Sequence, residues 1–544
     1  SKSEKPSTDL QNLLDLELNL MELLQVEYPR LYLALVHHKN TKGESLDFSD
    51  KKYLLPIYRD NSQEIKIKKA VQMGVSEWAI CEAFALCDKG LGVFYVHPTQ
   101  VLRSAFVKNR IDRLKETVPY YNKQLKEFKE GADSAVMKHF GKGVVKFVGS
   151  NALNEFIEFP ADCVIVDEKD RCNSDNLLYA QDRLQASKFK YIREIGNPTV
   201  EGIGIDKSFK DSDQKQWLIK CPHCNEWQCL DFFINIVRQK TDSTYELLDL
   251  EWKDGTPRDI FVFCRNCGRV VDRLSEGEFI PMQPGHKISG YQLSNLFSPT
   301  VLIKELWELF NKSLGDETIK QVFFNSRLGV AFTSTGAKLS LPLLEACMGD
   351  YANLTTSTGS AMGIDVGAWL HVIIREVNEK GNPRIIHIGS YRTFEELDGI
   401  MIQFNVRVGV IDAKPETRKA KEFQSKHNRK IWLCDYFTQP NLQAIKRNED
   451  DRTINADRTQ TLDSSHAEIL NKKILLPKNY KSLDKGGFVS QMCAPTRIWD
   501  EDDQRFKWVE GEADHYRHAD NYAWMASQLI GNSMLIGILE SREE

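Results

Sequence analysis

Short apolar runs alternate with longer amphipathic stretches between residues 60 and 200. Five runs have the length of buried strands: 65–70, 92–97, 144–149, 162–167 and 190–196. Three stretches carry apolar residues at helical spacing: 76–88, 100–117 and 177–187. Strands that alternate with helices pack as a parallel sheet with helices on its faces. The first part of the chain is therefore predicted to be an open α/β domain.

A different order of elements follows the polar segment 349–360. The pattern predicts, in chain order, strands at 361–366, 371–377 and 384–391, a helix at 394–404, a strand at 406–411, a helix at 415–427, a strand at 430–434 and a final helix near 512–530. This β-β-β-α-β order would place the strand 406–411 beside the strand 361–366. We expect a second α/β domain with a mixed sheet.

These patterns divide the chain into an N-terminal helical segment (1–45), a first domain (46–348), a linker (349–360) and a second domain (361–544). The N-terminal segment has leucines at helical spacing, which suit either a packing helix or a docking surface for a partner. Residues 205–290 break the α/β rhythm with paired cysteines, so we expect an inserted subdomain there, with a metal ribbon at 217–272.

Composition describes a globular protein and leaves the partners open. Of the 544 residues, 41% are apolar and 27% charged, and 72 Lys and Arg face 77 Asp and Glu, a net charge of -5. This balance gives no overall attraction for nucleic acid, but it permits local basic grooves. No run of about 18 apolar residues predicts a membrane span, and no signal peptide is apparent, so we expect an intracellular protein without membrane contact.

The segment after the first predicted strand has features of a phosphate-binding loop. Such a loop needs a glycine turn, a helix N-terminus behind it and a hydroxyl that holds Mg²⁺. Gly74 and Ser76 fit the end of this pattern, while Val75 stands where a lysine is usual. Lys68 and Lys69 lie upstream, within reach of the phosphates.

An acidic pair strengthens the nucleotide hypothesis. The apolar strand 162–167 ends in Asp167 and Glu168, where an ATPase would hold Mg²⁺ through Asp167 and polarise the attacking water with Glu168. A buried strand that happens to end in acids is the structural alternative. The next strand ends in a segment that could couple hydrolysis to movement: Gly196, Asn197, Pro198 and Thr199.

Two Cys-x-x-Cys pairs indicate a structural zinc site. The ligands are Cys221, Cys224, Cys264 and Cys267. Four thiolates in two such turns suit tetrahedral Zn²⁺. A redox pair is the alternative, but two pairs within one inserted segment argue against it. His223 and Cys229 are interpreted as bystanders.

Three carboxylates predict a nuclease in the second domain. Asp365 lies mid-strand among apolar residues, Asp412 ends the strand expected beside it, and Asp520 lies on the last helix. A buried carboxylate is costly unless it meets a cation, and two Mg²⁺ or Mn²⁺ held by such acids can hydrolyse a phosphodiester. His515 or His518 could assist, or could lie on the helix surface. We expect Asp457 to cap the next helix rather than line a DNA groove.

The order of these features resembles the large subunit of tailed-phage terminases, with the lambda-like branch nearest. The likeness covers about residues 50 to 530 and implies a P-loop (ASCE-type) parallel-sheet ATPase with a zinc-ribbon insertion, followed by an RNase H-like nuclease domain. In that branch the catalytic lysine lies upstream of the loop and matches Lys69. The remaining nucleotide-site positions are Gln72, Gly74, Val75, Ser76 and Asp167.

The resemblance further implies a motor that uses ATP and Mg²⁺ to package double-stranded DNA and that cuts concatemers. Its partners would be the portal of a procapsid and a small terminase subunit, and its active form a homo-oligomeric ring, commonly a pentamer, in the host cell cytoplasm. An arginine would act in trans, with Arg103 and Arg110 as candidates.

Two other functions fit parts of the sequence. A cellular DNA repair or recombination enzyme would also join an ATPase to a nuclease, but it predicts helicase motifs between 200 and 350, where the cysteine pairs stand. A zinc-ribbon DNA-binding protein with degenerate catalytic sites would show no ATP hydrolysis that depends on Glu168.

Overall fold

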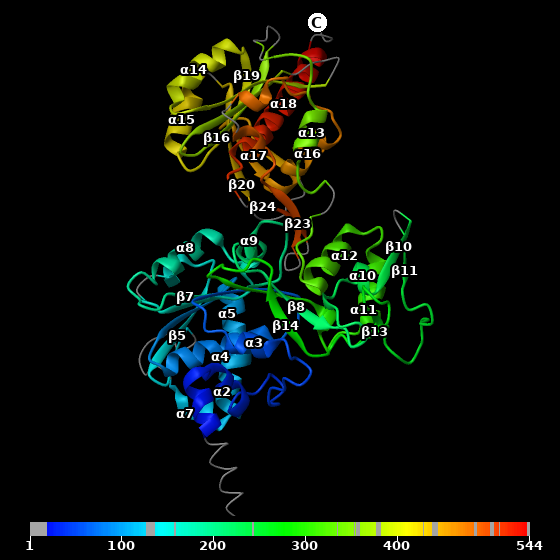
Figure 1. Cartoon of the computed structure of the whole chain (residues 1–544). Helices are drawn as coiled ribbons and strands as arrows, with labels where there is room; N and C mark the ends of the chain where they lie inside the picture. Colours follow the sequence, from blue (N-terminus) through cyan, green and yellow to red (C-terminus); the bar gives the residue numbers. More distant parts are fainter. Residues whose placement is uncertain are drawn as a thin grey trace, which may run out of the picture. The chain divides into compact units, whose positions relative to one another are not determined.

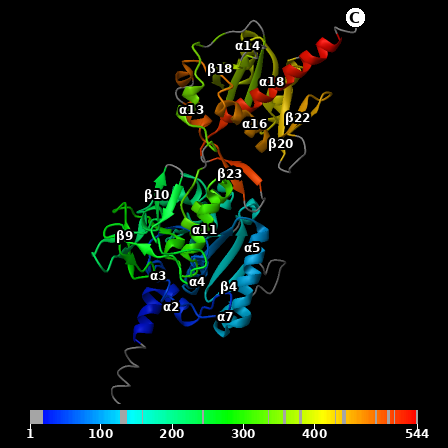
Figure 2. The ribbon, with the colours of Figure 1, turned by 90° about the vertical axis from the view of Figure 1, so that its right-hand side faces the viewer.

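The computed structural model describes residues 19–126, 136–156, 159–241, 244–333, 336–352, 354, 359–376, 382–427, 429–437, 444–483, 487–500, 505–510 and 512–540, with side chains to 530. The chain forms two compact units, Ser1–Phe332 and Thr333–Glu544. Figures 1 and 2 draw their elements from two sides. No helix among the described residues combines the length and apolar character that a bilayer crossing requires.

An eleven-stranded sheet forms the centre of the first unit. Its strands, in spatial order, are β14 (Gly277–Pro281), β8 (Lys215–Lys220), β15 (Ser289–Leu293), β1 (Glu64–Lys69), β7 (Tyr191–Gly196), β6 (Cys163–Val166), β2 (Gly92–His97), β5 (Gly143–Gly149), β4 (Met137–Phe140) and β3 (Leu125–Lys126). The pairs from β8 through β5 are parallel. β9 (Trp227–Cys229) pairs with β8.

The order within this sheet confirms the predicted ATPase fold class. β7 lies between β1, which leads into the phosphate-loop candidate, and β6, which leads into the acidic pair. Because all three strands are parallel, their carboxyl ends meet at one edge of the sheet, where ligands bind in open α/β folds.

Helices cover both faces of this sheet. They are α2 (Pro29–Val36), α3 (Leu54–Arg59), α4 (Val75–Asp88), α5 (Gln100–Phe106), α6 (Arg113–Thr117), α7 (Pro119–Gln124), α8 (Ser174–Asp182), α9 (Gly204–Lys210), α10 (Phe232–Asn235), α11 (Ile303–Ser313) and α12 (Glu317–Gln321). Two π-helical segments, Val107–Asp112 and Val322–Leu328, continue α5 and α12. One large apolar core joins α4 and the N-terminal helices to the sheet, and a smaller core lies under α8.

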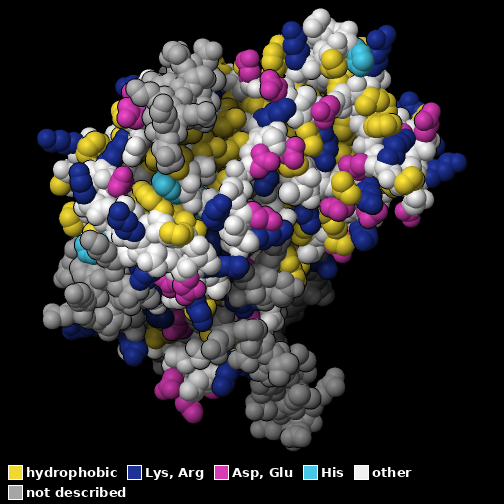
Figure 3. Space-filling view, turned by 90° about the horizontal axis from the view of Figure 1, so that it is seen from below, with side chains coloured by type: hydrophobic (Ala, Val, Ile, Leu, Met, Phe, Trp, Pro, Cys, Tyr) yellow, Lys and Arg dark blue, Asp and Glu magenta, His cyan; other side chains and the backbone are white. Residues whose placement is uncertain are grey.

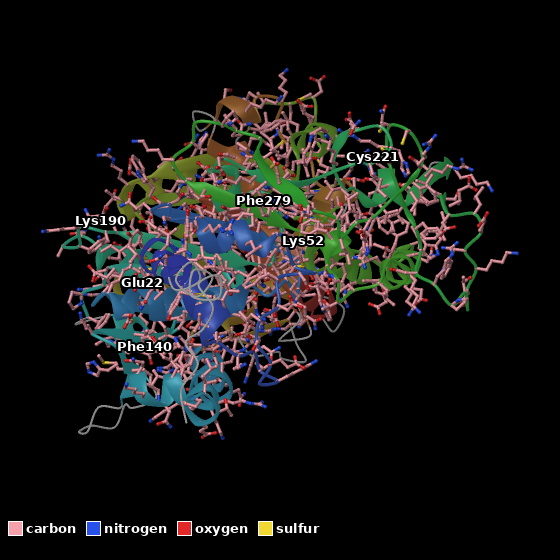
Figure 4. The ribbon with its side chains drawn as sticks, turned by 60° about the horizontal axis from the view of Figure 1, so that its bottom comes forward. Glu22, Lys52, Phe140, Lys190, Cys221 and Phe279 are labelled. Atoms are coloured by element: carbon pink, nitrogen blue, oxygen red, sulfur yellow. The ribbon has the colours of Figure 1, made fainter. Side chains whose placement is uncertain are left out.

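The segment 205–290, expected as an inserted subdomain, also extends the main sheet. β8, β14 and β15 come from it, and β8 pairs antiparallel with β14 across the intervening cysteine motifs. Small hairpins make up the rest: β10 (Val237–Thr241) with β11 (Thr244–Leu247), and β12 (Val262–Phe263) with β13 (Val270–Val271). Cys221 and Phe279 lie in this green part of the chain, and Phe140 lies in the cyan part at the other edge of the sheet (Figure 4).

The second unit is built on a seven-stranded sheet. Its spatial order is β18 (Arg384–Tyr391), β17 (Leu370–Glu376), β16 (Ser360–Val366), β19 (Val406–Asp412), β20 (Ile431–Phe437), β22 (Thr453–Asp457) and β21 (Ile445–Asn448). β16 pairs parallel with β19, as the β-β-β-α-β order predicts, and antiparallel with β17. This arrangement has the strand order expected of the RNase H-like fold.

Helices cover the second sheet on both faces. α14 (Phe394–Gln403) and α15 (Thr417–Lys426) pack on one core. The others are α13 (Leu341–Ala346), α16 (Arg458–Leu470), α17 (Gly487–Met492) and α18 (His515–Glu540), and a hairpin of β23 (Thr496–Asp500) and β24 (Arg505–Val509) accompanies them. Asp457 accepts a hydrogen bond from the Gln460 backbone N–H, which confirms it as the cap of α16.

A glycine lets α18 lie directly on β16. A Cβ atom at Gly363 would stand 2.0 Å from the Ala519 carbonyl oxygen and 2.2 Å from the Ala523 nitrogen. No side chain fits there, so the helix and the strand meet backbone to backbone. This contact fixes the start of α18 over the end of β16.

The boundary between the units falls earlier than the predicted linker. Leu339, Leu344 and Cys347, expected in the first domain, belong to a core of the second unit. Part of the segment 349–360 lies outside the described residues, as do residues 1–18 of the N-terminal segment.

Candidate functional sites

The loop between β1 and α4 has the backbone of a phosphate-binding turn. Gly74 has φ +82°, and a Cβ atom there would lie 3.1 Å from Leu54, so glycine suits this position. α4 begins at the next residue and directs its N-terminal N–H groups at the loop, where an anion is stabilised. A cavity of about 660 Å³ opens at this point.

Five of the six predicted nucleotide-site residues line this cavity, whereas Asp167 lies beneath the lining, beside Glu168. The lining includes Lys69, Gln72, Gly74, Val75, Ser76, Glu168 and Asn197. Residues from the N-terminal part of the unit close another wall, among them Phe48, Leu54 and Tyr58. The cavity therefore combines polar groups suited to phosphates with a mixed wall that also carries Glu44, Asp47 and Asp50, and its volume suits a nucleotide.

The two candidate lysines have different surroundings. Lys68 lies 3.0 Å from Asp206 and 4.3 Å from the centre of the Phe209 ring. The Nζ atom of Lys69 lies 3.1 Å from a Glu168 carboxylate oxygen and 3.0 Å from the Asn197 side-chain oxygen. Successive residues of a strand point to opposite faces, which separates the two. Lys69 is the lysine that faces the cavity.

The acidic pair joins this lysine at the end of β6. Asp167 is buried and accepts a hydrogen bond from the Tyr95 hydroxyl at 3.1 Å. Burial, with the negative charge of Glu168, raises the pKa of Asp167 to about 6. A divalent cation would offset both effects. Glu168 has φ +52°, a left-handed backbone that is unfavourable for a residue with a side chain.

The predicted coupling segment connects to the acidic pair through Asp170. Asp170 accepts hydrogen bonds from the Thr199 backbone and hydroxyl at 2.9 and 2.8 Å. The Asn197 side chain both accepts from Lys69 and donates to the Lys69 carbonyl. Gly196 is buried against Ile205, where a Cβ would stand 3.2 Å away, and Pro198 is buried beside it. The segment thus contacts both Lys69 and Asp170 directly.

The two candidate trans arginines have partners within their own unit. Arg103 is buried and lies 3.2 Å from Glu155. Arg110 lines the loop cavity and bonds to Glu77 at 2.6 Å, within the first turn of α4. Both guanidinium groups are therefore already engaged in ion pairs within the first unit.

The four cysteines of the knuckle motifs converge. Their sulfur atoms all lie within 4.8 Å of one another, with Cys221 and Cys267 at 3.8 Å and Cys224 and Cys264 at 3.7 Å. Sulfur atoms bound at about 2.3 Å to a tetrahedral zinc lie about 3.8 Å apart. The thiols therefore fit Zn²⁺. His223 is exposed and Cys229 bonds to Gln216, and neither belongs to the group.

In the second unit, Asp365 meets two histidines. The Nδ1 atom of His515 lies 2.9 Å from an Asp365 carboxylate oxygen, and this hydrogen bond raises the pKa of His515. His371, opposite Asp365 in the β16–β17 register, stacks on His515 with ring centres 4.7 Å apart. The three side chains form a group that could hold a metal ion.

Asp412 lies on the neighbouring strand at the same end. Burial, with the charge of Asp365, raises the pKa of Asp412 to about 6, and His518 opposes this effect. The pairing of Ile364 with Ile411 brings the next residues, Asp365 and Asp412, to the same edge of the sheet. The structure thus brings two of the three predicted nuclease acids together.

Asp520 does not join them. Its side chain is fully buried between two arginines, 2.5 Å from Arg375 and 3.2 Å from Arg517. Both carboxylate oxygens are engaged in these ion pairs. The prediction that Asp520 is a third metal ligand is therefore wrong. Asp520 lies further along α18, on a face directed at β17 rather than at the end of β16.

Asp514, absent from the sequence prediction, stands immediately before α18. With Glu510 and His518 it forms a second group of converging ligand atoms, and its carboxylate lies 3.2 Å from His518. Burial alone would raise the pKa of Asp514, but His518 and Arg458 lower it. The sequence carried a signal for it: an acid ahead of a helix with histidines at 515 and 518 on one face.

Comparisons with known proteins bear on the first unit and on the fold. Residues 57–280 match the family described as phage terminase large subunit gpA, ATPase domain. The large terminase of bacteriophage HK97 has a similar fold, with a TM-score of 0.52 and 10% identity over 92% of this chain and 98% of that chain. A search of curated protein sequences gives no match.

Two further solved structures are similar in part. The large terminase of a thermophilic bacteriophage has a TM-score of 0.32 and 11% identity, over 88% of this chain and 98% of that chain. The ATPase domain of the large terminase of Thermus phage P74-26 has a TM-score of 0.31 and 11% identity, over 53% of this chain and 94% of that chain.

Proposed function

We infer that this chain is a viral DNA-packaging motor. The premise is that its ATPase domain is that of a terminase large subunit. It hydrolyses ATP to move double-stranded DNA into a procapsid, and it cuts concatemeric DNA through its second unit. The observation that carries the proposal is the meeting of Lys69, Glu168 and Asn197 at one loop cavity, because it joins the phosphate loop, the hydrolytic acid and the coupling segment.

The first unit supplies the groups for ATP hydrolysis. Lys69 and the N–H groups of the loop bind the phosphates, and Ser76 and Asp167 hold Mg²⁺. Glu168 orients and polarises the attacking water. Asn197 follows the position of Lys69, and the segment from Gly196 to Thr199 passes that change to the rest of the unit.

The second unit supplies the ligands of a nuclease. We assign Asp365, Asp412 and Asp514 to this role, with Asp514 in the place expected of Asp520. Two Mg²⁺ or Mn²⁺ ions bound there would activate water and stabilise the leaving oxygen. His515 and His371 orient Asp365, and His518 pairs with Asp514 while its charge also acts on Asp412.

The zinc site stabilises the inserted part of the first unit. The backbone N–H groups of Cys221 and Cys264 donate to Glu226 and Arg269, which closes each turn on its own knuckle. The side chain of Gln228 accepts from the Arg265 backbone and from Asn235, so the two knuckles are also tied by protein contacts. Structural Zn²⁺ would add its binding free energy to folding.

The partners follow from the proposed activity. Double-stranded DNA is the cargo, the portal of a procapsid and a small terminase subunit are the protein partners, and a homo-oligomeric ring, commonly a pentamer, is the active form in the host cell cytoplasm. On the face drawn in Figure 3, Lys and Arg side chains are interspersed with Asp and Glu, so DNA would be held by local basic groups rather than a uniformly charged surface.

One panel of variants tests both activities in the full chain. Glu168→Ala should abolish DNA-stimulated ATP hydrolysis and leave metal-dependent DNA cleavage intact. Asp365→Ala should do the reverse, because the two sites lie in separate units. Equal ATPase rates in wild type and Glu168→Ala would favour a zinc-ribbon DNA-binding protein, and cleavage by Asp365→Ala at the wild-type rate would exclude the assigned nuclease site.

Packaging is distinguished from DNA repair by a translocation assay. Purified procapsids with portal, added to the chain and ATP, should protect DNA from an external nuclease in wild type and not in Glu168→Ala. Protection that needs no portal, or ATP-dependent strand separation of a duplex, would favour a repair or recombination enzyme instead.

A further inference from the structure

A large aromatic side chain is exposed to solvent beside the candidate nuclease centre. Trp369 lies in the tight turn between β16 and β17, shortly after Asp365, and its side chain is 42% exposed. The turn is closed by a hydrogen bond from the Gly367 N–H to the Trp369 carbonyl oxygen at 3.2 Å. Tryptophan usually buries most of its surface, so the exposed indole is an available contact.

A guanidinium covers part of this indole. The Cζ atom of Arg392 lies 4.7 Å from the centre of the Trp369 ring. The backbone N–H of Arg392 donates to the Glu396 carboxylate at 2.9 Å, which fixes the start of α14 beneath it. A guanidinium stacked on an indole makes a flat surface that is both apolar and positively charged. Such a surface suits the flat face of a nucleobase.

The pair lies close to the groups that would hold the metals. A Cβ atom at Gly367 would stand 3.5 Å from the His515 ring, and His515 bonds to Asp365. A hollow of about 420 Å³, lined in part by Gly367, Leu370 and Arg392, opens next to the turn. Its other walls carry both acids and lysines, among them Glu395, Asp398, Glu416, Glu422, Lys419 and Lys426. The hollow is therefore no phosphate site, and stacking is what this surface offers.

We propose that Trp369 and Arg392 form a stacking platform that holds a nucleotide of the DNA strand beside the scissile phosphate. This inference rests on the proposed nuclease function and goes beyond it, because it names a substrate contact that the metal ligands do not provide. Stacking on an aromatic ring is tolerant of sequence, since every base has a flat face. Trp369 is thus a positioning residue, which acts by orienting the strand.

Steady-state cleavage of linear duplex DNA by the full chain with Mn²⁺ tests the platform. Trp369→Ala should raise KM for DNA by about tenfold, as loss of one base–aromatic stack implies. Its kcat should stay within about twofold, and ATP hydrolysis should not change. Trp369→Phe should restore most of the affinity, whereas Arg392→Gln should give an intermediate rise. Ile402→Ala and Arg418→Gln serve as controls, since both side chains are exposed in the same unit.

A second readout is local to the indole. Duplexes with 2-aminopurine near one end should lose fluorescence on binding wild type in the presence of EDTA, and keep it with Trp369→Ala. Wild-type KM together with unchanged quenching in Trp369→Ala would overturn the platform. A wild type that fails to cleave would refute the proposed nuclease, and the quenching would still decide the platform. Loss of procapsid binding alone would make Trp369 a protein contact and also overturn it.

Discussion

Lys68 and Lys69 are neighbours in the sequence, yet they serve different purposes in the first unit. The turn after β1 determines which of them faces the cavity, and alternation along the strand directs the other at Asp206. Distance along the chain left both lysines possible as the phosphate-binding residue, and the family resemblance favoured Lys69. Geometry at the end of β1 separates them.

Lys69→Ala should therefore remove ATP hydrolysis, with kcat lower by at least about 100-fold, because a cation at the transferring phosphate is lost. Lys68→Gln should keep near-normal kcat while it lowers thermal stability, since buried Asp206 loses one of its two ion pairs and keeps only the more exposed Lys210. Steady-state ATPase assays and thermal unfolding measure the two effects. The reverse pattern would transfer the role to Lys68.

Asp514 and Asp520 form a second contrasting pair. Asp514→Asn should lower the cleavage rate by at least about 100-fold and should cost less stability than Asp520→Asn, because its ion pairs are with His518 and a more distant Arg458. Asp520→Asn should cost about 3–5 kcal/mol of unfolding free energy, because Arg375 and Arg517 stay buried beside a neutral amide. Cleavage assays on folded protein at low temperature, paired with urea unfolding, separate the roles. A folded but inactive Asp520→Asn with an active Asp514→Asn would restore Asp520 as a ligand.

The acids at strand ends were the predictable part of both sites. Asp167, Asp365 and Asp412 each interrupt or end an apolar strand, and parallel pairing brings such positions to one edge. Asp520 was misplaced for a physical reason. Which face a helix turns to the sheet depends on its packing partner, here Gly363 and the arginine of β17, and neither is visible from spacing along α18.

At the scale of elements, the sequence pattern predicted the strands near both sites, but it did not predict the strands that extend the main sheet of the first unit. β1, β6, β7, β16 and β19 were all placed within about two residues, because their apolar runs are local signals. The extension of the main sheet by β8, β14 and β15 was not predicted. Its pairings join segments separated by the cysteine knuckles, and no local pattern records such long-range contacts.

Three elements of the first unit meet at one buried carboxylate. Glu82 of α4 is 1% exposed and bonds to Arg30 of α2 and, at 2.7 Å, to Arg193 of β7. Burial alone would raise the pKa of Glu82, but the two guanidinium groups lower it below its ordinary value. The ionised form is therefore favoured by folding, and its contribution is complete at neutral pH and lost as pH falls below the ordinary carboxyl pKa.

Glu82→Gln should cost the first unit about 3–5 kcal/mol at neutral pH, because two buried arginines would face a neutral side chain. The difference from wild type should shrink as the pH falls below about 4, where Glu82 of the unfolded chain binds a proton that the native carboxylate does not. Urea unfolding across this range measures it. A difference that is independent of pH would mean that packing, rather than charge, holds these elements together.

Over the whole molecule, each unit has its own cores, and the zinc ligands belong to the first unit alone. Removal of zinc should therefore destabilise the first unit and leave the second unit folded. Calorimetry with a zinc chelator should show the transition of the first unit at lower temperature, restored by added Zn²⁺. Cys264→Ser should reproduce the loss without chelator, whereas Cys229→Ser should not. Unchanged unfolding after metal removal would contradict a structural zinc.

The left-handed backbone of Glu168 has an evolutionary consequence. A side chain held in that region costs about 1 kcal/mol or more, which other residues of the unit must offset. Replacement by glycine or asparagine would relax the strain and increase the stability of the unit. It would also remove the carboxylate proposed to act in ATP hydrolysis. Selection for stability and selection for catalytic activity therefore favour different residues at position 168.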